Sequence, residues 1–353
     1  MKKILLCASA IALHALHCPA QNGYPINPVP FTSVTVTPGT FWGQRLQASR
    51  EVTIPLAFSK CEQTGRYTNF TNAAAHLKDP SKVFKVGGYS FDDTDPYKTI
   101  EGASYLLQTY PDKRLAQYID SVIDIIAAAQ EPDGYLYTAR TQNPQQPHDW
   151  AGRTRWSKEE DLSHELYNLG HMVEAAIAHY QATRSRKFLD IAMRYADVVC
   201  REVGPRPGQA CVVPGHQIAE MALAKLYLAT GDKKYLDHVE WDLKCVCNYP
   251  DWVHDHFLGA ATMSIGVGLA YDWLYDVLSP ETKDMVVKTL RSHSIDPSMA
   301  PDPSTQKEWW WHSTSNNWNQ VCECGLATAA FAIYETCPEI AKAVIEKAGS
   351  SNV

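Results

Sequence analysis

The sequence carries no excess of positive charge. Its 39 acidic residues outnumber the 32 basic ones, and the formal net charge is −7 at pH 7. Nucleic acids and anionic membrane surfaces attract basic proteins, so we expect neither as a partner. With 45% hydrophobic and 20% charged residues, the composition is that of an ordinary globular protein.

The cysteine spacing shows no compact disulfide framework. Several cysteines lie in apolar helical patterns, as Cys200 does in "YADVVCREV", which indicates buried free thiols. The two C-x-C pairs leave a four-thiolate zinc site open as an alternative, although C-x-x-C is the more diagnostic spacing. Beyond the first 21 residues the cysteines are Cys61, Cys200, Cys211, Cys245, Cys247, Cys322, Cys324 and Cys337.

The start of the sequence has the pattern of an export signal. Two lysines precede an apolar run from Ile4 to about Leu16, which is too short to cross a bilayer. A small-residue exit, Pro19-Ala20-Gln21, follows. We therefore expect a signal peptide at residues 1–21 and a periplasmic or secreted protein, with a retained anchor as the alternative.

Strand-like alternation is confined to "FTSVTVTP" at residues 31–38. From Phe41 onward, apolar residues recur at steps of three and four, which is the helical period. Joints such as "ATGDKKYL" and "LSPETKDM" separate successive helices and recur along the chain, so the pattern is a helical-hairpin repeat. We predict an all-α fold, an (α/α) toroid built from helical hairpins, whose ring can be incomplete. The expected helices are 42–61, 97–110, 113–130, 163–183, 187–203, 217–229, 233–247, 257–278, 281–293, 318–336 and 338–348.

A long segment without helical periodicity, residues 131–162, interrupts the repeat. Loops of this length in compact domains tend to be functional, so we expect it at one mouth of the ring. Its aromatic and cationic side chains suit a sugar ring, although an irregular surface loop is the plainer interpretation. These side chains are Tyr135, Tyr137, Trp150, Arg153 and Trp156.

Polar side chains stand where the helical pattern favours apolar ones in "DLSHELYNLGHMVEAAIAHY". On a helix His164, Asn168 and His171 fall at i, i+4 and i+7 and share one face. Two imidazoles and an amide on one stripe are costly to bury unless they have partners, which favours a polar cavity. Structural histidines at the rim of the ring are the alternative.

Two further helix entrances carry polar residues. His216 and Glu220 are four residues apart at the start of one helix, after a Pro-Gly turn. Asp93 and Asp95 precede another helix, where an acid at the positive end of the dipole is more often a cap than a catalyst. Three such entrances together are typical of the mouth of a ring enzyme.

Several segments together resemble glycoside hydrolase family 127, the β-L-arabinofuranosidases of plant-glycan-degrading bacteria. They are "VTPGTFWGQRLQASREVTIP", "FDDTDPYKTIEGASYLL", "AAQEPDGYLYTART", "DLSHELYNLGHMVEAAIAHYQAT" and "PGHQIAEMALAKLYLATGDKKYLD". The resemblance covers residues 24–237 and implies hydrolysis of terminal L-arabinofuranose from an oligo- or polysaccharide substrate. It also implies that His164 and His216 contact the sugar and that Asp95 lies near its subsite.

The same resemblance implies a retaining mechanism with a cysteine thiolate as nucleophile. Zinc held by one glutamate and three cysteines would lower the pKa of that thiol, and a separate glutamate would be the acid and base. These groups lie downstream of the resembling region in the family. Their combination of a glutamate-x-cysteine with an adjacent cysteine-cysteine pair does not occur here, so neither a nucleophile nor a metal ligand is assigned and the catalytic half is expected to be missing.

Residues 238–353 resemble the helical domain of heparinase II/III-type polysaccharide lyases, through "YDWLYDVLSPE" and "NNWNQVC". In those lyases an Asn neutralises the uronate carboxylate before proton abstraction. Asn317 is the best match and Asn316 the next, with a helix N-cap as the plainer role for Asn317. The tryptophans at 309–311 could stack on sugars.

The sequence thus predicts three parts: a signal peptide (1–21), an arabinofuranosidase-like part (22–237) and a lyase-like part (238–353). The join lacks a Pro/Gly/Ser linker. A glycoside hydrolase of the β-L-arabinofuranosidase type is the favoured function. A uronate lyase acting by β-elimination and a catalytically silent glycan-binding protein are the alternatives.

Overall fold

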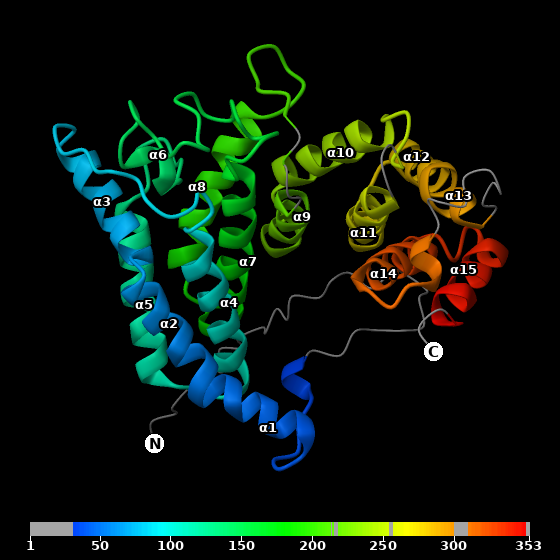
Figure 1. Cartoon of the computed structure of the whole chain (residues 1–353), viewed down its shortest axis with the longest axis horizontal. Helices are drawn as coiled ribbons and strands as arrows, with labels where there is room; N and C mark the ends of the chain where they lie inside the picture. Colours follow the sequence, from blue (N-terminus) through cyan, green and yellow to red (C-terminus); the bar gives the residue numbers. More distant parts are fainter. Residues whose placement is uncertain (1–30, 213, 215–217, 254–256, 300–309, 351–353) are drawn as a thin grey trace, which may run out of the picture.

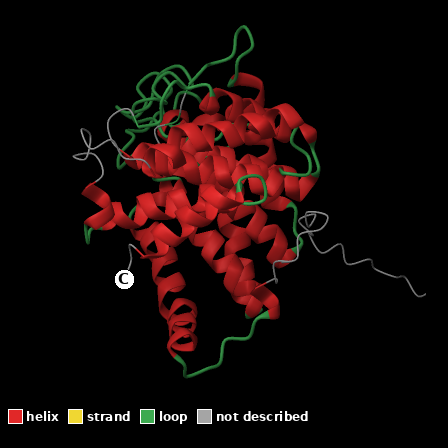
Figure 2. Cartoon of the chain, turned by 90° about the vertical axis from the view of Figure 1, so that its right-hand side faces the viewer, coloured by secondary structure: helices red, strands yellow, loops and turns green. Residues whose placement is uncertain are grey.

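The computed structural model describes residues 31–212, 214, 218–253, 257–299 and 310–350. The expected signal peptide, His216 and Trp309 lie outside these residues. Helices and loops make up the described chain, and none of it forms a strand (Figure 2). Its α-helices are α1 (Phe41–Ala48), α2 (Ile54–Gln63), α3 (Arg66–Lys78), α4 (Thr94–Thr109), α5 (Lys113–Ala128), α6 (Thr138–Thr141), α7 (Glu165–Thr183), α8 (Lys187–Glu202), α9 (Ala219–Thr230), α10 (Lys233–Cys247), α11 (Phe257–Leu274), α12 (Pro280–Leu290), α13 (Asp296–Met299), α14 (Asn317–Ala332) and α15 (Pro338–Ser350).

The predicted joints form helical hairpins for local reasons. Asp112 begins α5 by accepting hydrogen bonds from the backbone N–H groups of Arg114 and Leu115 at 2.8 and 3.2 Å. Ser279 does the same for α12, whose first residue is a proline. Each cap satisfies backbone N–H groups that the first turn leaves without partners, so it fixes the residue at which the second helix of the hairpin begins.

The hairpins line up as two layers. Helices α4, α7, α9, α11 and α14 pack one against the next, and α5, α8, α10 and α12 form a second row outside them. Figure 1 shows α2–α8 as a block of steep helices and α9–α15 as an arc that curves away from it. The prediction of an all-α, toroid-like array of hairpins is therefore confirmed, and the described helices form an open arc of that ring.

Close contacts between inner helices depend on small residues. A Cβ added at Gly325 of α14 would come within 2.5 Å of the carbonyl oxygen of Ala261 in α11, and one at Gly170 of α7 within 2.4 Å of the Ile218 side chain. Helix α11 is long and apolar enough to cross a membrane, yet half of it is buried inside this fold. Its apolar residues are thus used to pack against α14 and α9.

Four local expectations need correction. Residues 31–38 form a short 3-10 turn and coil instead of a strand, because no partner strand is available to them among the described residues. Helix α3 was not expected, since its apolar side is narrow and buries only Phe70 and Ala73. Helix α7 begins at Glu165, so His164 precedes it. The helix near 318 begins at Asn317, so its N-cap is Asn316.

Candidate functional site

The N-terminal ends of the inner helices meet on one side of the array, here called the mouth. The hydroxyl of Ser90, just before α4, donates to the backbone oxygen of Leu162, just before α7, at 2.8 Å. Phe257 at the start of α11 stacks on Trp311, just before α14, with ring centroids 4.7 Å apart. Polar groups from segments far apart in the sequence are therefore gathered at the mouth.

His164 occupies the junction of α4 and α7. Its backbone is left-handed (φ 63°), and the residue is only 9% exposed. The ring Nδ1 lies 2.5 Å from the Leu162 carbonyl oxygen and 3.3 Å from the Ser90 hydroxyl. A carbonyl can only accept, so Nδ1 carries the proton in this contact. A left-handed histidine costs backbone energy and is enriched at functional sites.

The remainder of the predicted stripe continues from His164 along α7. Asn168 is fully buried and donates to the His164 carbonyl oxygen at 2.7 Å. The Tyr167 ring lies between the two imidazoles, with centroids 5.6 Å from His164 and 4.5 Å from His171. Burial, with help from Lys98, lowers the pKa of His171 to about 4. His171 is thus neutral at physiological pH.

Three aspartates stand at the entrance of α4. Arg66 of α3 binds Asp95 at 2.7 Å and Asp92 at 3.1 Å. Asp93 is buried and accepts hydrogen bonds from the backbone N–H and hydroxyl of Thr138, and burial raises the pKa of Asp93 to about 7. Asp95 therefore lies near the mouth as an ion-pair partner, and Asp93 fastens the start of α6.

The third entrance is that of α9. His216 lies outside the described residues, so the structure does not place it. Burial raises the pKa of Glu220, in the first turn of α9. Burial and the Glu220 charge also raise the pKa of Asp242 on α10.

The segment 131–162 has a buried first part, residues 134–139, and a more exposed remainder that places Trp156 in the core. Tyr135, Tyr137 and Trp156 are each less than 5% exposed and belong to the core, so the expectation that they meet a sugar at the surface is wrong. Their polar atoms are used inside the protein: the Tyr135 hydroxyl donates to Glu165 at 2.5 Å, and the Trp156 indole donates to Glu202 at 3.0 Å. Tyrosine and tryptophan find such partners when they are buried.

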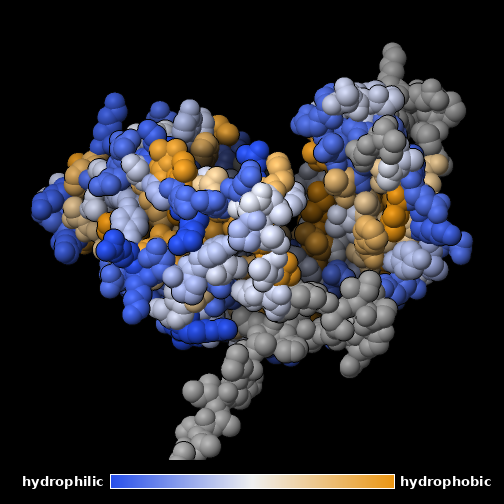
Figure 3. Space-filling view, turned by 90° about the horizontal axis from the view of Figure 1, so that it is seen from below, coloured by the Kyte–Doolittle hydropathy of each residue, from blue (hydrophilic) through white to orange (hydrophobic). Residues whose placement is uncertain are grey.

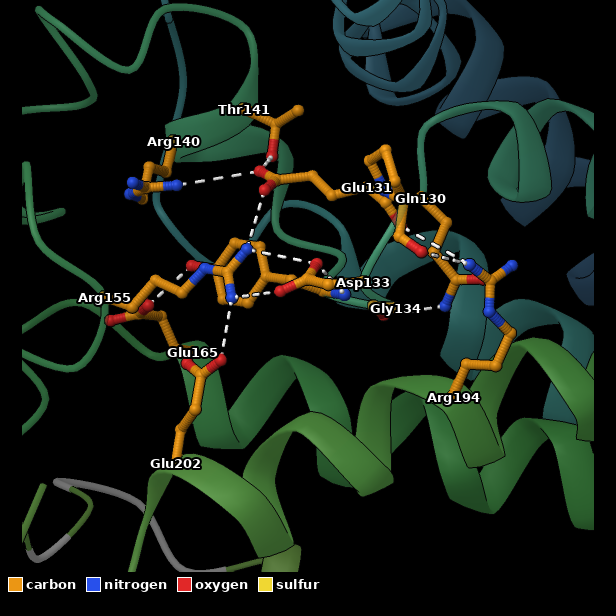
Figure 4. Close-up of polar contacts among 12 residues, drawn as sticks. Gln130, Glu131, Asp133, Gly134, Arg140, Thr141, Arg155, Glu165, Arg194 and Glu202 are labelled. Atoms are coloured by element: carbon orange, nitrogen blue, oxygen red, sulfur yellow. Dashed lines mark hydrogen bonds and ion pairs between the residues drawn. The ribbon is translucent and has the colours of Figure 1, made fainter. Parts of the chain in front are cut away.

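An arginine ties this segment to α8 (Figure 4). The Arg155 guanidinium lies within 2.6–3.0 Å of carboxylate oxygens of Glu131, Asp133 and Glu202. It also stacks over the Tyr135 ring at 4.0 Å. These contacts make the segment a fixed wall of the mouth.

Two aromatic side chains at the mouth were not predicted from the sequence. Tyr89 is 53% exposed and lies parallel to Phe91, with centroids 5.1 Å apart and planes 4° apart. Trp150 is 5.7 Å from Tyr89, and Phe91 meets the His164 ring edge-on at 5.1 Å. The signal that could have shown this is the run "GYSF" directly before the aspartates.

The entrance of α14 has its own polar group. Asn316 caps the helix by accepting from the Trp318 backbone N–H at 2.9 Å, and the Asn317 side chain is exposed. Behind them His312 Nδ1 lies 2.6 Å from the buried Glu323 carboxylate. Of the expected tryptophans, Trp311 is buried in the core and Trp310 is 42% exposed.

The described residues do not fit a zinc site. All eight cysteines beyond residue 21 are free thiols, and burial raises the pKa of several of them, Cys200 and Cys322 each to about 12. Within the described ranges, no three His, Cys, Asp or Glu side chains lie close enough together to hold a metal ion. A zinc thiolate set needs converging, ionised sulfurs, so we derive no step through zinc.

Comparisons with known proteins decide the family. A family model described as "Beta-L-arabinofuranosidase, GH127 catalytic domain" matches residues 33–251. The chain belongs to glycoside hydrolase family 127. The match extends past residue 237, and α10 (Lys233–Cys247) crosses the expected join without interruption.

Relatives in this family agree with that assignment. A non-reducing end β-L-arabinofuranosidase of Bifidobacterium longum subsp. longum is 41% identical over 170 residues, which are 48% of this chain and 24% of that enzyme. A solved GH127 β-arabinofuranosidase is 46% identical, with a TM-score of 0.72 over 93% of this chain and 54% of its own. A GH127 β-L-arabinofuranosidase from Geobacillus stearothermophilus T6, 23% identical, shares the fold with a TM-score of 0.67 over 89% of this chain and 55% of its own. The chain thus spans about half or less of the length of these relatives.

Proposed function

We propose that this chain recognises terminal β-L-arabinofuranosyl residues of plant glycans, as part of a glycoside hydrolase. The observation that carries the proposal is the placement of His164. Its imidazole is held at the meeting point of α4 and α7 by Leu162 and Ser90, in a strained backbone. An imidazole fixed in this way at the mouth is a group that can form a hydrogen bond with a sugar hydroxyl.

The surrounding residues supply what a small polar sugar needs. Phe91 and Tyr167 each meet the His164 ring edge-on, at 5.1 and 5.6 Å between centroids, and so provide apolar surface next to it. Arg66 holds Asp95 in place at the entrance of α4, so a hydroxyl near that carboxylate would meet a fixed acceptor. In the proposed site these groups bind and orient the sugar, and the groups that cleave it remain unassigned.

Binding and hydrolysis should be measured together on the full chain. We expect an arabinofuranoside to bind by titration calorimetry, and His164→Ala to weaken that binding about tenfold, the loss of one hydrogen bond to a desolvated site. His76→Ala is the control, because His76 is a half-buried histidine of α3 whose ring bonds the Lys82 carbonyl oxygen away from His164. Release of arabinose from a chromogenic β-L-arabinofuranoside would show turnover, whereas binding without release would favour a silent glycan-binding protein.

A uronate lyase is the second candidate. It depends on Asn317, whose exposed side chain lies at the first turn of α14. Rising ultraviolet absorbance from unsaturated uronate ends, abolished by Asn317→Ala, would support it. Absence of that signal together with arabinofuranoside binding would exclude it.

We also propose that the protein is periplasmic or secreted, on the basis of the basic and apolar pattern of residues 1–21. Cell fractionation with a C-terminal tag tests this. A tagged protein found only in the cytoplasm would contradict it.

A further inference from the structure

We propose that Tyr89, Phe91 and Trp150 form an aromatic platform that binds the second sugar of the substrate, next to the terminal residue held by His164. This inference rests on the function proposed above and names a specificity site within it. The platform would make the protein prefer an arabinofuranosyl disaccharide or longer chain over a single arabinofuranoside.

The first argument is exposure. Tyr89 is 53% exposed, although an aromatic ring of this size gains free energy when it is buried. The ring is not isolated, because it lies parallel to Phe91 and beside Trp150. A contiguous aromatic surface that remains in contact with water is typical of a binding site.

The second argument is rigidity. The backbone N–H of Tyr89 donates to the buried Asp92 carboxylate at 3.0 Å, and Gly88 has a left-handed backbone there (φ 76°). A Cβ at Gly88 would lie 2.0 Å from the Asp92 carboxylate, so only glycine lets the loop approach this closely. The Tyr89 loop is therefore ordered before any ligand arrives.

The opposite side of the platform is fixed to the same loop. The Nε2–H group of His148 donates to the Gly88 carbonyl oxygen at 3.0 Å, and its Nδ1 accepts a hydrogen bond from the Trp150 backbone N–H at 3.1 Å. One imidazole thus joins the loop that carries Tyr89 to the loop that carries Trp150. Because this order exists in the free protein, little entropy is lost when a sugar binds, and stacking contributes fully to affinity.

The third argument is position. Phe91 contacts both Tyr89 and the His164 ring, each at a centroid distance of 5.1 Å. A sugar bound at His164 would therefore have the platform directly at its side. The occupant that fits is a neutral sugar, since its C–H face can stack on aromatic rings without needing a charged partner.

The test compares two probes on the full chain by titration calorimetry: methyl β-L-arabinofuranoside and an arabinofuranosyl disaccharide. We expect Tyr89→Ala and Trp150→Ala each to weaken disaccharide binding about three- to tenfold, and the methyl glycoside by less than about twofold. Tyr89→Phe keeps the ring and should bind both probes as the wild type does. Tyr110→Ala, a partly exposed tyrosine of the same chain outside the mouth, is the control for general loss of structure.

The outcomes separate the two proposals. Equal affinity of wild type and both alanine variants for the disaccharide would overturn the platform while leaving the His164 site standing. An equal loss for both probes would also overturn it, because the rings would then belong to the first sugar's site. Wild-type protein that binds neither probe would refute the proposed function, and the platform with it.

Discussion

Replacing Arg155 by alanine should weaken the attachment of the wall of the mouth to α8, where the Trp156–Glu202 hydrogen bond would remain. The guanidinium neutralises three carboxylates, of which Glu131 and Glu202 are only 16% and 28% exposed. We count about 1 kcal/mol for each of these two pairs, less for the more exposed Asp133, and about 1 kcal/mol for the stacking on Tyr135. The free energy of unfolding should therefore fall by about 2–4 kcal/mol, since the remaining carboxylates also repel one another.

Urea denaturation followed by circular dichroism measures this loss. Arg153→Ala is the matched control, because its exposed side chain is two residues away, and the hydrogen bond from Arg140 reaches only its backbone oxygen. Arg155→Lys should recover less than half of the loss, because an ammonium cannot form the planar fork that reaches several carboxylates. A loss below about 1 kcal/mol for Arg155→Ala, or equal losses for the two alanine variants, would refute this reasoning.

Two further predictions concern burial and packing. Burial raises the pKa of Glu165 to about 7 from an ordinary value of 4.5, so the stability it contributes is complete below pH 4.5 and is lost as the pH rises through 7. Glu165→Gln should remove about 3 kcal/mol of that pH dependence. Gly325→Ala should cost about 2–3 kcal/mol of unfolding free energy, because its Cβ would strike the Ala261 carbonyl oxygen, whereas Gly349→Ala meets no atom and should cost nothing. Denaturation curves at several pH values check the first prediction, and thermal melts check the second. A Glu165→Gln stability that depends on pH as the wild type does would contradict the first, and a Gly325→Ala variant as stable as the wild type would contradict the second.

The helices could be predicted because their signals are local. Apolar spacing and cap residues such as Asp112 and Ser279 lie within the segment that they organise. Helix α3 escaped the prediction because it buries little more than Phe70 and Ala73, and so lacks a broad apolar stripe. That helix is held in place partly by Arg66, which forms an ion pair with Asp95, 29 residues further along the chain.

The aromatic residues of the mouth could not be sorted from sequence. Tyr135 and Trp156 are core, while Trp150 of the same segment lies partly at the surface. An irregular segment has no period that tells which side chains face inward. The sequence alone therefore predicts the same role, sugar contact, for all the aromatic side chains of this segment. Tyr89 was overlooked because its neighbour Trp150 comes from a loop 61 residues later, and only the fold brings the two rings together.

Seen from below, the surface is hollowed between the N-terminal block and the C-terminal arc (Figure 3). Such an open array must still close the ends of its inner helices. At α4, the Asp92 and Asp93 carboxylates accept hydrogen bonds from the Tyr89 and Thr138 backbones instead of facing outward. Not every acid at the mouth is therefore available for chemistry.

At the entrance of α7, the helix cap comes from an acid of the preceding loop and not from the residue at the N-cap position. His164 stands at the N-cap position but makes no side-chain cap, and Glu159 accepts the backbone N–H groups of Glu165 and Leu166 at 2.8 and 3.0 Å instead. A cap of this kind contributes about 0.5–2 kcal/mol, which removes the usual reason for a Ser or Asp at position 164. Because Glu159 from the preceding loop caps the helix, position 164 does not need a capping residue, so the binding role proposed for His164 is compatible with a stable α7.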